Sequence, residues 1–237
     1  MMLLGDEFQP STFVDAFRFI GDNPSFLATK ALEQLVLAGA ALGIALLVAL
    51  PVGIVLGHYH KGSSVAIGTS IVGRALPSLV LIGVFLTVLG IGFVNNMVAL
   101  AVLATGPVLT NSYDSIDRVD RDAVDAARGM GMTGPQVLRR IELPLAIPLL
   151  FTGIRIAAVT VVATAPIAAI AGGGGLGDVI VNQASYRLEG VLGASLCVMA
   201  LSAGVWLLLG ALQVAVTPSG LRRTRVPGEP PFGKEQL

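Results

Sequence analysis

The chain has 237 residues, of which 54% are hydrophobic and only 13% charged, and its 15 basic and 15 acidic side chains give a net charge of zero. A soluble domain carries about twice that charged fraction, and so few charges cannot cover the surface of a water-soluble protein of this size. The composition excludes intrinsic disorder, the single cysteine excludes a disulfide scaffold, and the charge balance argues against nucleic-acid binding. We therefore predict an all-α, polytopic membrane protein.

Five apolar runs are long enough to cross a bilayer, whose hydrocarbon core requires roughly 20 apolar residues in a helix. They are Leu35–Leu56, Val65–Gly92, Val94–Tyr113, Leu145–Ala171 and Val191–Val216. The second run contains Arg74 and Pro77, and we expect one tilted helix that is kinked near the proline. Residues 35–216 are thus predicted to form a bundle of five transmembrane helices.

The segment before the first span, residues 1–34, is predicted to be an extracytoplasmic lead-in. Asn23 followed by Pro24 is typical of a helix cap and a first helical residue. Within the first span, the small-residue pairs Gly39–Gly43 and Gly53–Gly57 are expected to let neighbouring helices approach closely.

Basic residues are distributed unevenly between the two sides of this bundle, and the richer side faces the cytoplasm. With the N-terminus outside, the inner segments hold ten: Lys61, Arg118, Arg121, Arg128, Arg139, Arg140, Arg222, Arg223, Arg225 and Lys234. The outer segments hold three, Arg18, Lys30 and Arg187; Arg74 and Arg155 lie inside the spans and are left out. The bias predicts an outer N-terminus and a cytoplasmic C-terminus, so that residues 217–237 form a cytoplasmic tail.

The segment between the third and fourth spans, residues 114–142, is longer than a bundle needs and carries six acids and five arginines. Long loops in compact domains tend to be functional. Its pattern predicts a helix, a turn and a second helix. Asp120 or Asp122 caps the first helix, Gly131 stops it, and a capping box over Thr133–Gln136 starts the second. The second helix is expected to end at Leu143-Pro144, because a residue before proline is disfavoured in a helix.

The acids of this loop are expected to pair with arginines rather than to bind a metal. Asp114 with Arg118, and Asp117 with Arg121, are four residues apart, a spacing at which opposite charges stabilise a helix by about 0.3–0.5 kcal/mol. The sequence leaves two roles open for the loop. It is either a docking surface, to which small residues permit close approach, or a cap that packs on its own bundle.

The residues Asp125-Ala126-Ala127, Gly131, Ile141 and Leu143-Pro144 have the spacing of the "EAA" loop of ABC importer permeases. The family pattern is Glu-Ala-Ala, three residues, Gly, nine residues and Ile-x-Leu-Pro, and Asp125 in place of glutamate is the only difference. The chain therefore resembles a type I importer permease over roughly residues 35–216. The resemblance implies that these residues couple the chain to an ATPase: the acid anchors the loop, Ala126, Ala127 and Gly131 permit docking, and Leu143-Pro144 fixes the loop to the fourth span.

Within that family, the chain is similar to the permeases for glycine betaine, choline, carnitine and related osmoprotectants. The similarity lies in residues 128–133, 137–144, 173–178 and 75–79. It implies a bacterial cell membrane protein with three partners: a cytoplasmic ABC ATPase, a second permease chain that is identical or paralogous, and an extracytoplasmic binding protein. A methionine-type amino-acid permease with the same loop is the near alternative.

Other motifs carry less weight. Two Gly-x-Gly-x-x-Gly matches, at 129–134 and 172–177, fall where no dinucleotide-binding fold is predicted. The phosphate-binding pattern Gly-x-x-x-x-Gly-Lys-[Ser/Thr] does not occur, so we expect no cofactor on this chain and ATP on its partner. His58 and His60 are expected in a solvated turn at the end of the first span rather than in a metal site. No catalytic constellation is present, so an enzyme is not expected.

The translocation path is the least determined part of the sequence. No Asp or Glu lies inside a predicted span, so the ion relay of a stand-alone secondary transporter, the alternative from a different class, is missing. We hypothesise that five residues within the spans approach the path: Pro77, Ser78, Asn111, Thr160 and Thr164. Helix-packing hydroxyls are the alternative interpretation. Because aromatics make up only 5% of the chain, an aromatic cage for a quaternary ammonium is expected on the binding protein.

Overall fold

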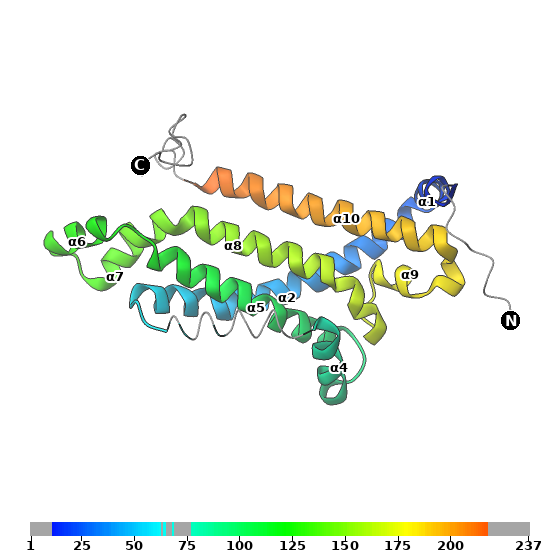
Figure 1. The fold of residues 1–237 in the computed structure, drawn as a ribbon, viewed down its shortest axis with the longest axis horizontal. Coiled ribbons are helices and arrows are strands. Elements are labelled where there is room, and N and C mark those ends of the chain that lie inside the picture. Colours follow the sequence, from blue (N-terminus) through cyan, green and yellow to red (C-terminus); the bar gives the residue numbers. More distant parts are fainter. Residues whose placement is uncertain (1–10, 63, 65–67, 69–76, 218–237) are drawn as a thin grey trace, which may run out of the picture.

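The computed structural model describes residues 11–62, 64, 68 and 77–217, and every regular element among those residues is a helix. Four helical segments in this part of the chain are long and apolar enough to cross a membrane, and they run along the long axis of the molecule (Figure 1). The predicted all-α membrane bundle is confirmed. The elements are α1 (Ser11–Asp22), α2 (Pro24–His58), α4 (Ser78–Leu89), α5 (Phe93–Asp117), α6 (Arg121–Gly129), α7 (Gly134–Val137), the π-helical η1 (Leu138–Glu142), α8 (Leu143–Thr164), the 3₁₀-helical η2 (Ala165–Ala171), α9 (Gly177–Val181) and α10 (Gln183–Val216).

Four of the five predicted spans lie within the long helices. Leu35–Leu56 lies in α2, Val94–Tyr113 in α5, Leu145–Ala171 in α8 and η2, and Val191–Val216 in α10. The 35 residues of α2 rise about 52 Å, whereas the hydrocarbon core of a bilayer is about 30 Å thick. The first turns of α2 therefore extend beyond the apolar run. α10 is kinked at Arg187, where φ is 54°, so its first turn is separate from the helix that holds the predicted span.

The second predicted span, Val65–Gly92, differs from the expectation. Most of its first half lies outside the described residues, and at Pro77 the backbone is extended, with a ψ of 131°. A new helix therefore starts here: Pro77 is the cap of α4, and its carbonyl accepts the first hydrogen bonds of that helix. With 12 residues, α4 is about 18 Å long and does not cross the hydrocarbon core by itself.

Small side chains bring the helices of the bundle together. Buried alanines recur along α2 and pack on α5: Ala38, Ala41, Ala45 and Ala49. A Cβ atom at Gly53 would lie 2.6 Å from Ser112 Cβ, and one at Gly57 would lie 2.8 Å from the Tyr113 carbonyl oxygen. Beyond the helix's own backbone and the chain neighbours, no described residue lies within 4 Å of such an atom at Gly39 or Gly43. The expected close packing is thus confirmed for the second glycine pair and is wrong, within this chain, for the first.

Gly53→Ala is expected to lower the free energy of unfolding by about 1–3 kcal/mol, since the added methyl group has no room between α2 and α5. Gly39→Ala is the matched control, because its methyl group meets open space and alanine stabilises a helix by about 0.5–1 kcal/mol relative to glycine. The thermal midpoint of the detergent-solubilised chain measures both effects. Equal midpoints for the two variants would contradict this account of the α2–α5 contact.

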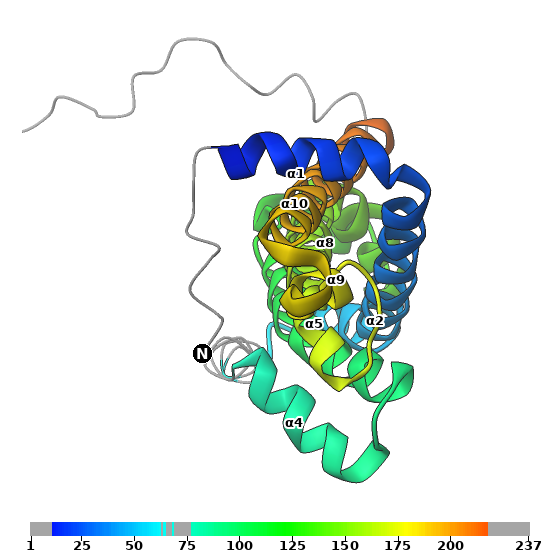
Figure 2. The ribbon, with the colours of Figure 1, turned by 90° about the vertical axis from the view of Figure 1, so that its right-hand side faces the viewer.

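The two ends of the bundle differ. α6 and α7 project from one end, while α1 and α9 lie at the other, where α1 crosses over α10 (Figures 1 and 2). Phe19 of α1 contacts Tyr186 of α10 edge to face, with ring centroids 6.4 Å apart. Asn23 precedes α2 as predicted, but its amide donates to the Phe19 carbonyl (3.0 Å) instead of capping the first turn. The outer position of the N-terminus stays a prediction.

Candidate functional site

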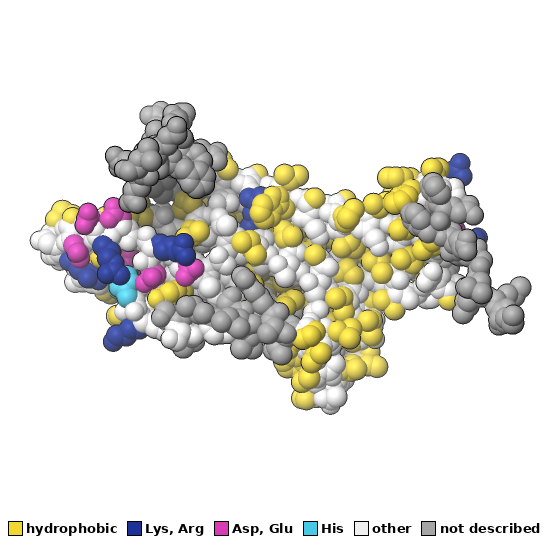
Figure 3. All heavy atoms as spheres, viewed as in Figure 1, with side chains coloured by type: hydrophobic (Ala, Val, Ile, Leu, Met, Phe, Trp, Pro, Cys, Tyr) yellow, Lys and Arg dark blue, Asp and Glu magenta, His cyan; other side chains and the backbone are white. Residues whose placement is uncertain are grey.

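The projecting end of the molecule is a helical elbow, residues 120–142, in which charged side chains gather (Figures 1 and 3). α6 begins after Asp120, whose carboxylate accepts a hydrogen bond from the Asp122 N–H (2.9 Å), so Asp120 is the cap. After α6, Gly131 adopts a φ of +82°. This left-handed conformation costs a residue with a side chain about 1–2 kcal/mol. The predicted first helix and its glycine stop are confirmed.

The second arm of the elbow continues into the bundle without a break. Gln136 Oε1 accepts from the Thr133 N–H (2.8 Å) at the start of α7, as the capping box predicts. The predicted end at Leu143-Pro144 is wrong, because α7 passes through η1 directly into α8. Pro144, the second residue of α8, has no N–H to donate, and in a regular α-helix its ring would clash with the carbonyl four residues earlier. The wider π-helical turn of η1 lies at this place. Single π-helical turns are frequent at functional sites.

The elbow has its own small hydrophobic core. Val124 and Ala127 of α6 are buried against Val137 of α7, Ile116 of α5 and Ala146 of α8. Ile141 and Leu143 pack against the same cluster and are partly buried. Ala127 is therefore buried inside the elbow and does not present a docking contact at its surface, contrary to the expectation. Asp125 and Ala126 are exposed.

Two histidine contacts join the two segments that flank the elbow, the end of α5 and the end of η1, to the end of α2 and the turn after it. His58 Nδ1 lies 2.6 Å from Glu142 Oε2, and the two side chains are only 8% and 2% exposed. His60 Nδ1 lies 2.7 Å from Asp117 Oδ1 at the surface. The expectation of a solvated turn is thus wrong for His58. The position of His58 at the end of the first span gives no sign that a carboxylate 84 residues later folds against this ring.

Of the predicted ion pairs along the loop, one is present. Arg118 Nη2 lies 3.4 Å from Asp114 Oδ2. Asp117 contacts His60 instead of Arg121, because α5 ends at Asp117 and Arg121 starts a separate helix.

A pocket of about 130 Å³ opens beside α6. Its polar lining consists of Arg121, Asp125, Arg128, His60 and Glu142, and its apolar lining comes from α5, α6 and the turn between them. Asp125, the acid predicted to anchor the loop, lies between two arginines of its own helix on this surface. The exposed tip of the elbow also presents Met130, which is 71% exposed and which no motif in the sequence singles out.

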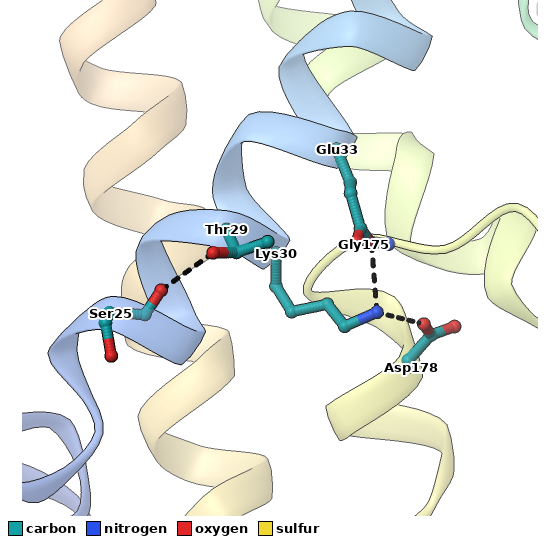
Figure 4. Close-up of polar contacts among 6 residues, drawn as sticks. All are labelled: Ser25, Thr29, Lys30, Glu33, Gly175 and Asp178. Carbon is teal, nitrogen blue, oxygen red and sulfur yellow. Dashed lines mark hydrogen bonds and ion pairs between the residues drawn. The ribbon is translucent and has the colours of Figure 1, made fainter.

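At the opposite end of the bundle, the glycine segment 172–177 is fastened to α2 by charged side chains (Figure 4). Glu33 Oε2 accepts from the Gly175 N–H (3.0 Å) and from Lys30 Nζ (2.9 Å). Lys30 Nζ also donates to Asp178 Oδ2 (2.8 Å). Three glycines of the segment have φ values of +70°, +72° and +79°, so the glycines serve a turn that this network holds in place.

Lys30 and Glu33 precede the apolar run that begins at Leu35, so they lie outside the membrane-spanning part of α2. The hydrogen bond to Asp178, followed by that to Glu33, raises the pKa of Lys30 above its ordinary value. The Gly175 N–H, followed by Lys30, lowers the pKa of Glu33. A lowered carboxylate pKa stabilises the fold at neutral pH, and this contribution is lost as the pH falls through the pKa of the folded state.

The residues hypothesised to approach a path are Pro77, Ser78, Asn111, Thr160 and Thr164. The first two start α4, where Pro77 is exposed. Asn111 of α5 packs against α8 at Gly153, and its amide donates to a carbonyl of its own helix (2.7 Å). The two threonines are partly exposed on α8, and the Thr160 hydroxyl also bonds to its own helix (2.8 Å). The structure thus brings Asn111 to α8, and the role of all five in transport stays a prediction.

The fold is that of the membrane-spanning chains of ABC importers. It resembles the inward-facing MetNI methionine ABC transporter with a TM-score of 0.70 over 81% of this chain and 96% of that chain, at 21% identity. It also resembles an amino acid ABC transporter crystallised with histidines, with a TM-score of 0.66 over 86% of this chain and 98% of that chain, at 21% identity. At this level of identity the likeness concerns the fold alone, and it confirms the predicted type I permease architecture.

Residues 49–219 match the family described as "binding-protein-dependent transport system inner membrane component", and the chain belongs to this family. It is therefore a multi-pass inner-membrane transport subunit and not an enzyme. The chain is 34% identical, over 86% of its length and 94% of the relative's, to the glycine betaine/carnitine/choline transport system permease protein OpuCB of Bacillus subtilis. It is 34% identical to the carnitine transport permease protein OpuCB of Listeria monocytogenes (89% and 97% covered). It is 30% identical to the osmoprotectant import permease protein OsmW of Salmonella typhimurium (88% and 100% covered).

Proposed function

We propose that this chain is the permease subunit of an ATP-driven importer for quaternary-ammonium osmoprotectants of the glycine betaine, choline and carnitine type. The observation that carries the proposal is similarity along nearly the whole length of permeases named for these solutes, at 34% identity over 94% and 97% of two of them. The likeness to methionine and amino-acid importers, at 21% identity, supports the architecture and not the solute.

The elbow is the proposed coupling element for a cytoplasmic ABC ATPase, which binds the ATP. Its supporting features are its projection from the bundle, its separate hydrophobic core and its exposed Asp125, Ala126 and Met130. A methionine at a protein surface adapts its shape to a partner, because its side chain is flexible and polarizable. Gly131 sets the turn, while Ile141, Leu143 and Pro144 join the elbow to α8.

Transport follows from rigid-body movement in this proposal. Two ATPase subunits approach each other when they bind ATP, and each carries an elbow with it. Because η1 joins the elbow to α8 and His58 joins it to α2, movement of the elbow reaches two spans directly. Two permease chains, identical or paralogous, would then rock between inward-facing and outward-facing states, and an extracytoplasmic binding protein would deliver the solute.

Affinity purification of the chain from native membranes in a mild detergent, followed by reconstitution in proteoliposomes, tests the proposal. We expect an ABC ATPase and a binding protein to co-purify, and radiolabelled glycine betaine, choline or carnitine to enter the vesicles only with ATP. Uptake of methionine alone would favour the amino-acid importer. Uptake without any ATPase would favour a stand-alone secondary transporter, with the elbow acting as a cap.

A further inference from the structure

Among the residues that the structure describes, Arg155 is a charged side chain within a membrane span, far from both charged ends of the bundle. Arg155 belongs to α8 (Leu143–Thr164), near the middle of the fourth predicted span. A guanidinium group at this depth is costly to place against lipid, and ionisable side chains within spans face protein or a water-filled cavity. The position of Arg155 therefore requires a protein or water environment on its side of α8.

The surroundings of Arg155 are specific. Its guanidinium carbon lies 3.2 Å from the centroid of a ring of Trp206 on α10, the single tryptophan of the chain, in a cation–π contact. A Cβ atom at Gly210, one turn further along α10, would lie 3.0 Å from Arg155 Nη1, so the glycine makes room for the guanidinium. The Nε atom of Arg155 is buried and has no hydrogen-bond partner among the described residues. The cation is thus held in place through its ring contact, and a ligand would have to approach its terminal Nη groups, because Nε is buried.

The same seam between α8 and α10 carries further polar groups. Ser202, one turn before Trp206, has a buried hydroxyl without a hydrogen-bond partner in the described part of the chain. On the other side of the pair, Gln213 of α10 donates to Thr152 Oγ1 of α8 (3.2 Å). Trp206 itself is 42% exposed in the single chain. The Ser202 hydroxyl and Arg155 Nε are buried between helices, so the group that this side presents is the partly exposed Trp206 ring with the guanidinium stacked on it. A cation at this depth is costly against lipid, which favours an aqueous path beside this pair.

We infer that Arg155 and Trp206 form a substrate contact in the translocation path, which binds zwitterionic osmoprotectants through their carboxylate group. A guanidinium group donates two parallel hydrogen bonds to a carboxylate, and these charge-assisted bonds are stronger than neutral ones. The exposed part of the Trp206 ring offers a π face to the quaternary ammonium of the same ligand. The inference rests on the proposed function and adds that the path prefers solutes that carry a carboxylate. Glycine betaine and carnitine carry a carboxylate, whereas choline carries only a hydroxyl group.

Uptake of radiolabelled glycine betaine and choline by the reconstituted full complex tests this inference. Arg155→Gln removes the charge, and we expect it to lower glycine betaine uptake about tenfold or more while choline uptake changes less than about twofold. Trp206→Leu is expected to lower uptake of both solutes, and Trp206→Phe to retain most of it. Arg18→Gln, at an exposed position on α1, is the matched control and should leave both solutes unaffected.

Recovery of the co-purified ATPase, measured for each variant, separates a binding role from a structural one. Unchanged glycine betaine uptake in Arg155→Gln, or an equal loss of both solutes together with the ATPase, would overturn the inference. A wild-type complex that transports choline and not glycine betaine would also overturn it. A wild-type complex that transports no osmoprotectant would instead refute the proposed function, before any variant is compared.

Discussion

His58→Ala should destabilise the junction between the elbow and the bundle by about 3–5 kcal/mol, since it leaves the Glu142 carboxylate buried without its partner. The contact is short, 2.6 Å, and the two side chains are 8% and 2% exposed. The loss is expected to loosen η1, where Glu142 lies, and to separate movement of the elbow from α2. Hydrogen exchange of the backbone amides of residues 134–146 measures the local effect, and the thermal midpoint of the solubilised chain measures the global one.

Two further variants test whether the unpaired Glu142 carboxylate causes the loss of stability in His58→Ala. A double variant, His58→Leu with Glu142→Leu, should be more stable than His58→Ala alone, because it leaves no unpaired polar group inside the protein. His60→Ala removes the neighbouring contact with Asp117, in which each side chain is about one third exposed. It should lower the free energy of unfolding by less than about 1 kcal/mol. If all three variants had the same stability, the His58–Glu142 contact would not be the anchor of the elbow.

The parts of this molecule that the sequence predicts correctly are those that depend on local chemistry. Span positions follow from runs of apolar residues, and the first arm of the elbow follows from a capping aspartate and a stop glycine a few residues apart. The start of α4 at Pro77 is harder to predict, because a proline within an apolar run is compatible with either a kink or a new helix start. Which of the two occurs depends on the packing of the neighbouring helices.

The parts that the sequence did not predict depend on contacts between distant residues. His58 and Glu142 are 84 positions apart, and a histidine after an apolar run reads equally well as solvated. Ala127 belongs to a motif that resembles a docking surface, yet only the fold shows that Val124 and Val137 cover it. The Lys30–Asp178 contact spans 148 positions, so the glycine segment could be noticed for its composition but not connected to α2.

Gly131→Arg is expected to leave membrane insertion intact and to reduce the amount of co-purified ATPase to background. Apart from its two chain neighbours, no atom of the described residues lies within 4 Å of a Cβ placed at Gly131, so the arginine side chain would extend outward from the elbow without displacing its core. In the proposed complex, that space belongs to the groove of the ATPase, and a long charged side chain would prevent the elbow from entering it. Co-purification from gently solubilised membranes, normalised to the recovered permease, measures the loss.

The positive φ of Gly131 adds a second effect of any substitution, and Gly131→Asn separates the two. Asparagine tolerates the left-handed conformation better than other residues with side chains and adds little bulk, so it tests the strain of the turn. We expect Gly131→Asn to retain most of the co-purified ATPase while Gly131→Arg loses it. Loss in both variants would show that the conformation of the turn, rather than the space beside it, determines docking. Retention in both would place the ATPase elsewhere on the chain, because a docked elbow could not accommodate an arginine at this position.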